Sequence, residues 1–390
     1  MKNWKYLLLS LLSLGVMTSC LKGDGWEPYE PEKPQVPVLT DDLQIHLSAT
    51  VIQANGEDYT TVTVYKNKKV LKDGYAFYTY PGNEPISFPN GRYSATEPGE
   101  LSFWVSYGTE NTYKTPTTIT AINFEIPERV EDPQPDSNNF SRKVLALKFT
   151  GTNCGYCPYM TNLVYNLTHD ETFGEYYDNI LVQADCHSYN STDPAYLVSP
   201  RLEQGFALGG YPTMVIDMMY SFSNYNNFEL FKSTIDNSYG DGVASAAISV
   251  NSKVVGSQVV AHVAVKVSET NQYRVGAFLM ENGISARQTS NLKPNEVIEA
   301  IDYNTHNHAI RVADCQTSRN DFSFRGLELG TLTAGSVADK VFTIKIDDSW
   351  VRENCYLVFF VTAKTGSSFP VVNVIETEAL EAELPFAYNN

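Results

Sequence analysis

Two cysteines separated by two residues are the side chains of this sequence best suited to chemistry. Cys154 and Cys157 enclose a Gly-Tyr dipeptide and precede a proline, and residues 159–169 are compatible with a helix. We therefore expect Cys154 at the exposed N-terminal edge of a helix, where free N–H groups and the helix dipole favour the thiolate. A thiolate is the nucleophile of disulfide exchange. Cys157, one turn further on and more buried, would then attack the mixed disulfide and release the substrate.

The flanking segments are typical of a thioredoxin-like α/β domain, which we predict over residues 142–242. An apolar run at 144–149 indicates a buried strand. A strand, a tight turn with Cys-x-x-Cys and a helix is the layout of a thioredoxin-like redox site. Tyr211, Pro212 and a threonine then precede a second apolar run at 214–219. This Pro-Thr pair resembles the thioredoxin-fold loop whose cis-proline faces the cysteines.

The resemblance implies a role for each residue of the site. Cys154 and Cys157 would be the catalytic pair. Pro212, as a cis-proline, would hold the backbone of Tyr211 where an extended substrate can pair with it. The glycine between the cysteines would keep the approach open, and Tyr156 would tune the pair. We assign Tyr156, Tyr211 and Pro212 to substrate binding.

Two positions depart from the usual redox enzymes of this fold. Asn153 stands where most have tryptophan, and Lys148 stands where many have a buried acid that accepts a proton. A lysine there can stabilise a thiolate, but it cannot accept a proton while it is charged. The alternative is that Cys154 and Cys157 form a permanent structural disulfide in a binding domain.

Three further cysteines have less specific signals. Cys186 follows a predicted apolar strand at 179–184 and could be a third redox cysteine, with His187 as a nearby base. The plainer interpretation is a packed cysteine beside a surface histidine. Cys315 and Cys355 share the last domain, and the sequence leaves open whether they form a disulfide there.

His306 and His308 are two residues apart on a possible strand, where both would face the same side. That spacing allows a metal pair, but no third group of ligands lies near in sequence, so we expect structural hydrogen bonding and no metal. No phosphate loop, serine elbow or zinc-protease motif is evident. We expect no cofactor.

The first residues resemble the signal peptide of a bacterial lipoprotein. Lys2 and Lys5 precede a short apolar core, and small residues then lead to Cys20. The resemblance implies cleavage after residue 19 and acylation of Cys20, which would anchor the chain to a membrane. Loss of the two lysines would change the net charge from -17 to -19. An ordinary secretory signal with an incidental cysteine is the alternative.

The sequence predicts a multidomain protein in which two β-sandwiches flank the thioredoxin-like domain. The predicted segments are a Pro-rich tether (20–40), an immunoglobulin-like β-sandwich (41–127), an acidic linker (128–141) and a C-terminal β-sandwich (243–380). Prolines at every third position favour an extended tether. Strands with period-two patterns separated by turn residues indicate the sandwiches.

The order of these parts also resembles a known group. A lipobox, a Cys-x-x-Cys-Pro domain and a C-terminal β domain with Tyr303 and the run His306-Asn307-His308 are similar to the twenty-eight-kilodalton outer membrane protein group of Bacteroidetes. The resemblance implies a cell outer membrane location, with the periplasmic or surface face left open.

The net charge argues against one class of partner, nucleic acids. A charge of -17 offers no basic surface for phosphates, so nucleic-acid binding is not expected. Our leading hypothesis is thiol-disulfide exchange on the thiols or disulfides of envelope proteins. The rival hypothesis is a non-catalytic binding lipoprotein that uses the thioredoxin fold as a scaffold.

Overall fold

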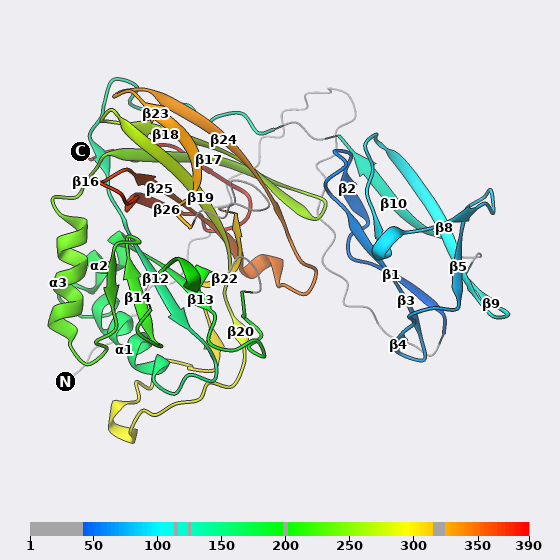
Figure 1. The fold of residues 1–390 in the computed structure, drawn as a ribbon, viewed down its shortest axis with the longest axis horizontal. Helices are drawn as coiled ribbons and strands as arrows, with labels where there is room; N and C mark the ends of the chain where they lie inside the picture. Colours follow the sequence, from blue (N-terminus) through cyan, green and yellow to red (C-terminus); the bar gives the residue numbers. More distant parts are fainter. Residues whose placement is uncertain are drawn as a thin grey trace, which may run out of the picture. The chain divides into compact units, whose positions relative to one another are not determined.

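The computed structural model describes residues 42–112, 116–123, 126–197, 202–206, 208–314 and 324–389. This part of the chain is mostly β-sheet, arranged in several sheets, as the sequence predicts (Figure 1). Its three α-helices are α1 (Cys157–Thr168), α2 (Gly174–Ile180) and α3 (Phe228–Tyr239). None of the described helices is long and apolar enough to cross a membrane. The predicted signal peptide, Cys20 and the tether lie outside the described residues.

Residues 42–122 form two sheets around one core. The first sheet contains β1 (Gln44–Leu47), β3 (Thr60–Lys66), β4 (Lys69–Val70) and β7 (Arg92–Tyr93). The second contains β2 (Val51–Gln53), β10 (Thr117–Ile122), β8 (Gly99–Tyr107), β5 (Tyr75–Thr79), β6 (Pro85–Ile86) and β9 (Glu110–Asn111). Val62 and Val64 of β3 share a core with Phe103 and Ile119 of the second sheet. The predicted short strands are present, and their immunoglobulin-like relationship stays a prediction.

A nine-stranded sheet carries the segment before the cysteine pair. Its main order is β15 (Tyr220–Phe222), β14 (Thr213–Ile216), β12 (Val144–Thr150), β13 (Leu181–His187), β22 (Ala309–Asp314), β19 (Asn271–Glu281), β25 (Cys355–Ala363) and β26 (Val371–Glu376), and β23 (Leu327–Leu332) also pairs with β19. β12 runs parallel to β13 and antiparallel to β14. β22 joins β13 where Asp185 lies opposite Ala309. This junction brings the chain near residue 308 next to β13, the neighbour of the strand that precedes the cysteines.

β12 is buried on both faces, which explains its continuous apolar run. Val144 and Ala146 belong to a core that includes Met160 of α1 and side chains of α2 and α3. Leu147 belongs to a second core, which includes Phe278 of β19. The strand therefore holds the cysteine turn on a rigid support.

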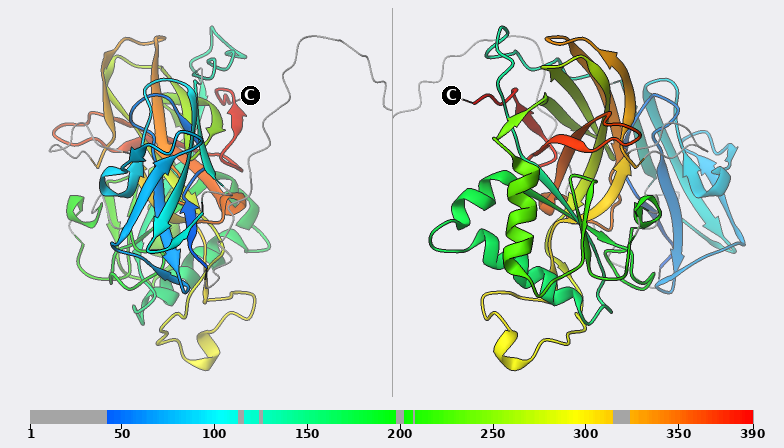
Figure 2. Two further views of the ribbon diagram at one scale, coloured as in Figure 1. Left: turned by 90° about the vertical axis from the view of Figure 1, so that its right-hand side faces the viewer. Right: turned by 60° about the vertical axis from the view of Figure 1, so that its left-hand side comes forward.

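Four of the strands after residue 243 form a second sheet layer. β24 (Val337–Lys345), β18 (Gln258–Val267), β17 (Ala246–Val255) and β27 (Ala382–Leu384) make a four-stranded sheet. This sheet lies against the C-terminal part of the nine-stranded sheet (Figure 2), and its apolar side chains share a core with those of β19 and β25. The nine-stranded sheet thus contains strands from both sides of the predicted boundary at residue 242, and the division into domains stays a prediction.

Short pairings complete the described topology. β11 (Phe140–Ser141) pairs with β16 (Val243–Ala244), and β20 (Ile284–Ser285) pairs with β21 (Thr305–His306). The predicted linker 128–141 is tied to the second layer, because the buried Lys266 ammonium donates to Asp132 and to the Pro135 carbonyl at 2.8 and 2.7 Å.

Candidate functional site

Cys154 and Cys157 are joined by a disulfide bond. Cys157 is the first residue of α1, and Cys154 lies in the turn between β12 and that helix. Residues 159–168 are helical, as the sequence predicts. The peptide bond between Tyr211 and Pro212 is cis, just before β14, which pairs with β12. The strand, turn and helix therefore occur in the predicted order.

The predicted exposure of Cys154 is wrong. Cys154 is 3% exposed and Cys157 is 2% exposed. The expectation of an open approach at Gly155 is also wrong, because a Cβ placed there would lie 2.7 Å from the Asn291 amide nitrogen. The cause is a segment far along the chain, residues 286–304, which connects β20 to β21 and lies against the turn. We call residues 286–304 the strap.

Backbone hydrogen bonds hold the strap on the cysteine turn. The N–H groups of Thr289 and Asn291 donate to the carbonyls of Thr152 and Gly155, both at 2.8 Å. The Gln288 side-chain amide donates to the Cys154 carbonyl at 3.0 Å. Sequence reasoning missed these contacts, since a polar loop more than 130 residues away gives no signal of where it will dock.

A buried carboxylate supports the turn from another side. Asp193 Oδ2 accepts the Thr152 N–H at 2.7 Å and lies 2.8 Å from His187 Nδ1. Burial by itself would raise the pKa of Asp193, but the hydrogen bond and charge of His187 and two backbone N–H groups lower it to about 2. His187 is 2% exposed. The expectation of a surface histidine is therefore wrong.

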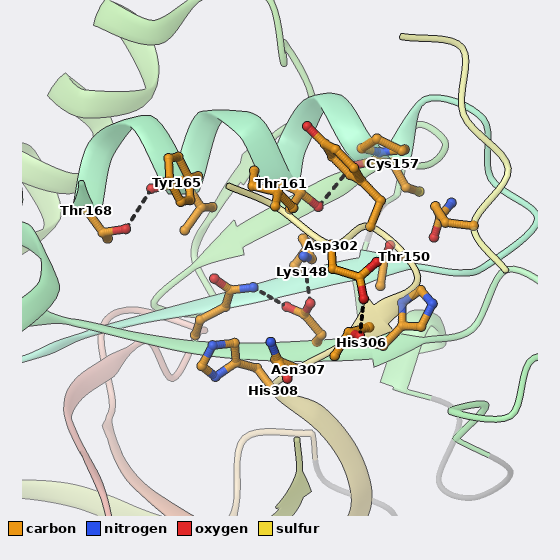
Figure 3. Close-up of a pocket in the computed structure, with 18 of the residues that line it drawn as sticks. Lys148, Thr150, Cys157, Thr161, Tyr165, Thr168, Asp302, His306, Asn307 and His308 are labelled. Atoms are coloured by element: carbon orange, nitrogen blue, oxygen red, sulfur yellow. Dashed lines mark hydrogen bonds and ion pairs between the residues drawn. The ribbon is translucent and has the colours of Figure 1, made fainter. Parts of the chain in front are cut away.

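Beside the disulfide lies a cavity of about 550 Å³ whose lining includes Cys157, Lys148 and Asp185. Figure 3 shows α1 along one side and Lys148 pointing into the space from the sheet. Lys148 Nζ is 2.6 Å from Asp185 Oδ2, and both side chains are nearly inaccessible to water. Gln183 donates to the other carboxylate oxygen at 2.8 Å. The parallel register of β12 and β13 places Lys148 directly opposite Asp185.

His306 and His308 also line this cavity, but they do not share a strand. His306 ends β21, whereas His308 lies between β21 and β22 with a φ of 56°. The expected common face is therefore wrong. His306 Nε2 is 3.1 Å from the Ala286 carbonyl, and His308 Nδ1 is 2.8 Å from the Tyr356 hydroxyl. Burial lowers the pKa of both imidazoles, and no group of metal ligands occurs among the described residues.

The remaining cysteines that the structure describes are buried free thiols. Cys186 lies within β13, and burial strongly raises its pKa, so the thiol stays protonated. Its surroundings are those of a packed core side chain. Cys355 begins β25, and burial raises its pKa to about 12. Cys315 lies outside the described residues.

The predicted substrate-binding tyrosines have different surroundings. Tyr156 is 51% exposed, and its ring stacks on that of Tyr225 with centroids 5.9 Å apart. The Tyr211 hydroxyl is 2.9 Å from Ser188 Oγ, and its ring meets that of Tyr189 edge-on. Tyr156 is therefore the more accessible of the two, and their role in substrate binding stays a prediction.

Comparison with known proteins gives a family match over part of the chain. Residues 200–381 match the family described as outer membrane protein Omp28. The matched range is a little under half of the chain; it includes Pro212 and the strap but not the cysteine pair. The family description names the outer membrane, in agreement with the predicted location. No curated protein matches the sequence.

Two solved structures are similar in part. HBP35 of Porphyromonas gingivalis is 18% identical, with a TM-score of 0.49, over 65% of this chain and 80% of that one. A crystal structure of an Agrobacterium tumefaciens protein is 11% identical, with a TM-score of 0.34, over 64% of this chain and 96% of that one. At these values neither likeness bears on function.

Proposed function

We propose that this protein is a lipid-anchored envelope protein of the outer membrane that exchanges disulfides with other envelope proteins. Residues 142–242 would be its thioredoxin-like domain, residues 41–127 an immunoglobulin-like spacer, and Cys20 the acylated anchor. The match of residues 200–381 to an outer membrane protein family supports the location. The observation that carries the function is the Cys154–Cys157 disulfide in the turn between a buried strand and a helix.

The exchange starts from the oxidised state. A substrate thiolate attacks Cys154 Sγ, the Cys154–Cys157 bond breaks, and its electron pair leaves on Cys157 Sγ. A second substrate thiolate then attacks the substrate sulfur of the mixed disulfide and releases Cys154. The substrate gains a disulfide and loses two protons and two electrons, and the protein gains a dithiol. The reverse sequence reduces a substrate.

The cavity beside the disulfide contains a charged pair. Cys157 lines the same space as Lys148 and Asp185. The ammonium group can stabilise the thiolate that Cys157 becomes when the disulfide opens. Lys148 would thus favour opening of the disulfide at Cys157.

The experiment compares the full chain in detergent with its Cys154→Ala variant, using a dithiol peptide and a disulfide peptide as test substrates. We expect turnover in the parent protein and none in the variant. Cys355→Ala is the matched control, because it removes a buried free thiol elsewhere. Equal turnover in parent and Cys154→Ala would refute the exchange function.

A non-catalytic binding protein is the second candidate, and the burial of both cysteines favours it. It predicts a disulfide that stays fully oxidised in cells and a phenotype that survives loss of either cysteine. Thiol trapping in growing cells distinguishes the two. A mixed or reduced population supports exchange, and complete oxidation supports a structural disulfide.

A further inference from the structure

The strap is a loop closed at its base by a short pair of strands. Ile284 pairs with His306 and Ser285 with Thr305, so the two ends of the strap are held together. His306 is buried at this base. In Figures 1 and 2 the strap is the yellow segment beside α1. The strap is held at this base, and residues 288–291 contact the turn that carries the disulfide.

The strap contacts the cysteine turn through backbone N–H groups of alternate residues. Thr289 and Asn291 are alternate residues, and both donate backbone N–H groups to carbonyls of the turn. Alternate residues of an extended chain point the same way, which is how peptides add to a protein edge. Any polypeptide in extended conformation can offer the same two donors.

The outer part of the strap is held by polar contacts to α1. The Tyr159 hydroxyl donates to Glu296 at 2.9 Å, and the Asn162 amide donates to the Glu296 carbonyl at 2.7 Å. The Tyr303 hydroxyl donates to the Asn162 carbonyl oxygen at 2.6 Å. Water can replace each of these contacts, and none of residues 282–305 is buried. Segments with few buried apolar contacts open at a low free-energy cost.

The second element that contacts the turn, Asp193, is buried, unlike the strap. Asp193 lies next to the buried His187 and accepts the backbone N–H groups of Thr152 and Ala195. Lifting it would expose a paired charge and break a network inside the protein. Of these two elements against the turn, the strap is the one that can move.

We propose that the strap is a lid that shields the Cys154–Cys157 disulfide and is displaced by an extended polypeptide segment of the redox partner. The partner's N–H groups would replace those of Thr289 and Asn291 on the carbonyls of Thr152 and Gly155. The identity of the partner rests on the proposed exchange function. The shielding does not, because it concerns access to the disulfide by any reductant.

The test measures how fast a small phosphine reduces the disulfide in the full chain in detergent. Gln288→Ala removes the side-chain amide that holds the strap to the Cys154 carbonyl. We expect reduction to accelerate about fivefold, the factor for one net hydrogen bond. Val297→Ala is the matched control, since Val297 lies on the strap with its side chain 47% exposed. This control should leave the rate unchanged.

A second variant acts without touching the strap sequence. Gly155→Ala places a methyl group where the Asn291 side chain now lies, so that side chain has to shift. Hydrogen exchange at the amides of Thr289 and Asn291 reports whether the strap has opened. Faster amide exchange together with faster reduction supports the lid. Faster amide exchange with an unchanged reduction rate overturns it, as does an unchanged reduction rate in both variants.

Reduction by phosphine needs no protein substrate, so this result is independent of turnover. Faster reduction in a protein that turns over no test peptide would keep the lid and remove the exchange function. If the protein turns over a test peptide but neither variant changes the rate of reduction by phosphine, the exchange function is kept and the lid is refuted. With the dithiol peptide as substrate, Gln288→Ala should also raise the exchange rate if both proposals hold.

Discussion

Replacing Lys148 by methionine would remove the counter-ion of a carboxylate that water scarcely reaches. The Lys148 and Asp185 side chains are 5% and 6% exposed, and Nζ and Oδ2 are 2.6 Å apart. Removing one partner of a buried ion pair lowers the free energy of unfolding by about 3–5 kcal/mol, because the remaining charge has no partner. Gln183 would still donate to Asp185, and the neighbouring cavity has room for water. We therefore expect Lys148→Met to lower the free energy of unfolding by about 3 kcal/mol, the lower end of this range.

The assay is hydrogen exchange of the β12 amides under native conditions, which reports the free energy of opening of this strand within a multidomain chain. Lys253→Met is the control, because Lys253 is exposed, and it should change the value by less than about 0.5 kcal/mol. Lys148→Met combined with Asp185→Leu removes both charges and should recover most of the loss. A loss below about 1 kcal/mol in Lys148→Met would mean that cavity water already solvates the carboxylate, and the buried-pair reasoning would fail.

Three further predictions concern other parts of the molecule. Cys186 and Cys355 should resist alkylation in the folded protein, since burial raises the pKa of both thiols; rapid labelling of either, read by mass spectrometry, would contradict this. The folded pKa of Asp193 is about 2, below its ordinary 3.8, so its stabilisation is complete above about pH 4 and is lost as the pH falls through 2. After allowance for solvent screening, ionised Asp193 contributes about 1–2 kcal/mol to the free energy of unfolding measured with denaturant. Asp193→Asn should remove this pH dependence of stability. Gly276→Ala would place a methyl group 2.2 Å from the Phe360 ring, and we expect such overpacking to lower the unfolding free energy by about 1–3 kcal/mol; an unchanged value would show that the ring moves freely.

The frame of the candidate site was predictable because its signals are local. The apolar run at 144–149 became β12, and the helix followed the cysteines as expected. Lys148 inside this run was predicted only to stabilise a thiolate, and no counter-ion was named for it, although lysine is rarely buried without one. The sequence holds many carboxylates, however, and only the parallel register of β12 and β13 selects Asp185.

The errors concern contacts between distant segments. The expectations for His187 and for His306 and His308 treated each histidine by its own neighbours in sequence. In the fold, β22 joins the edge of β13, and this junction brings residues 306–308 to the cavity beside the cysteines. No period-two or helical pattern encodes which strand will dock at an edge.

For the cysteine pair itself, the sequence alone determined the local geometry. Two intervening residues place Cys154 and Cys157 within reach of one disulfide, and the apolar strand before them and the helix after them follow from their own residues. Only the tertiary structure decided whether the pair can be reached. Exposure depends on every segment that packs nearby, and here the strap, more than 130 residues further along, lies against the turn. The chemistry of the site is thus a local property of the chain, and access to it is a property of the whole fold.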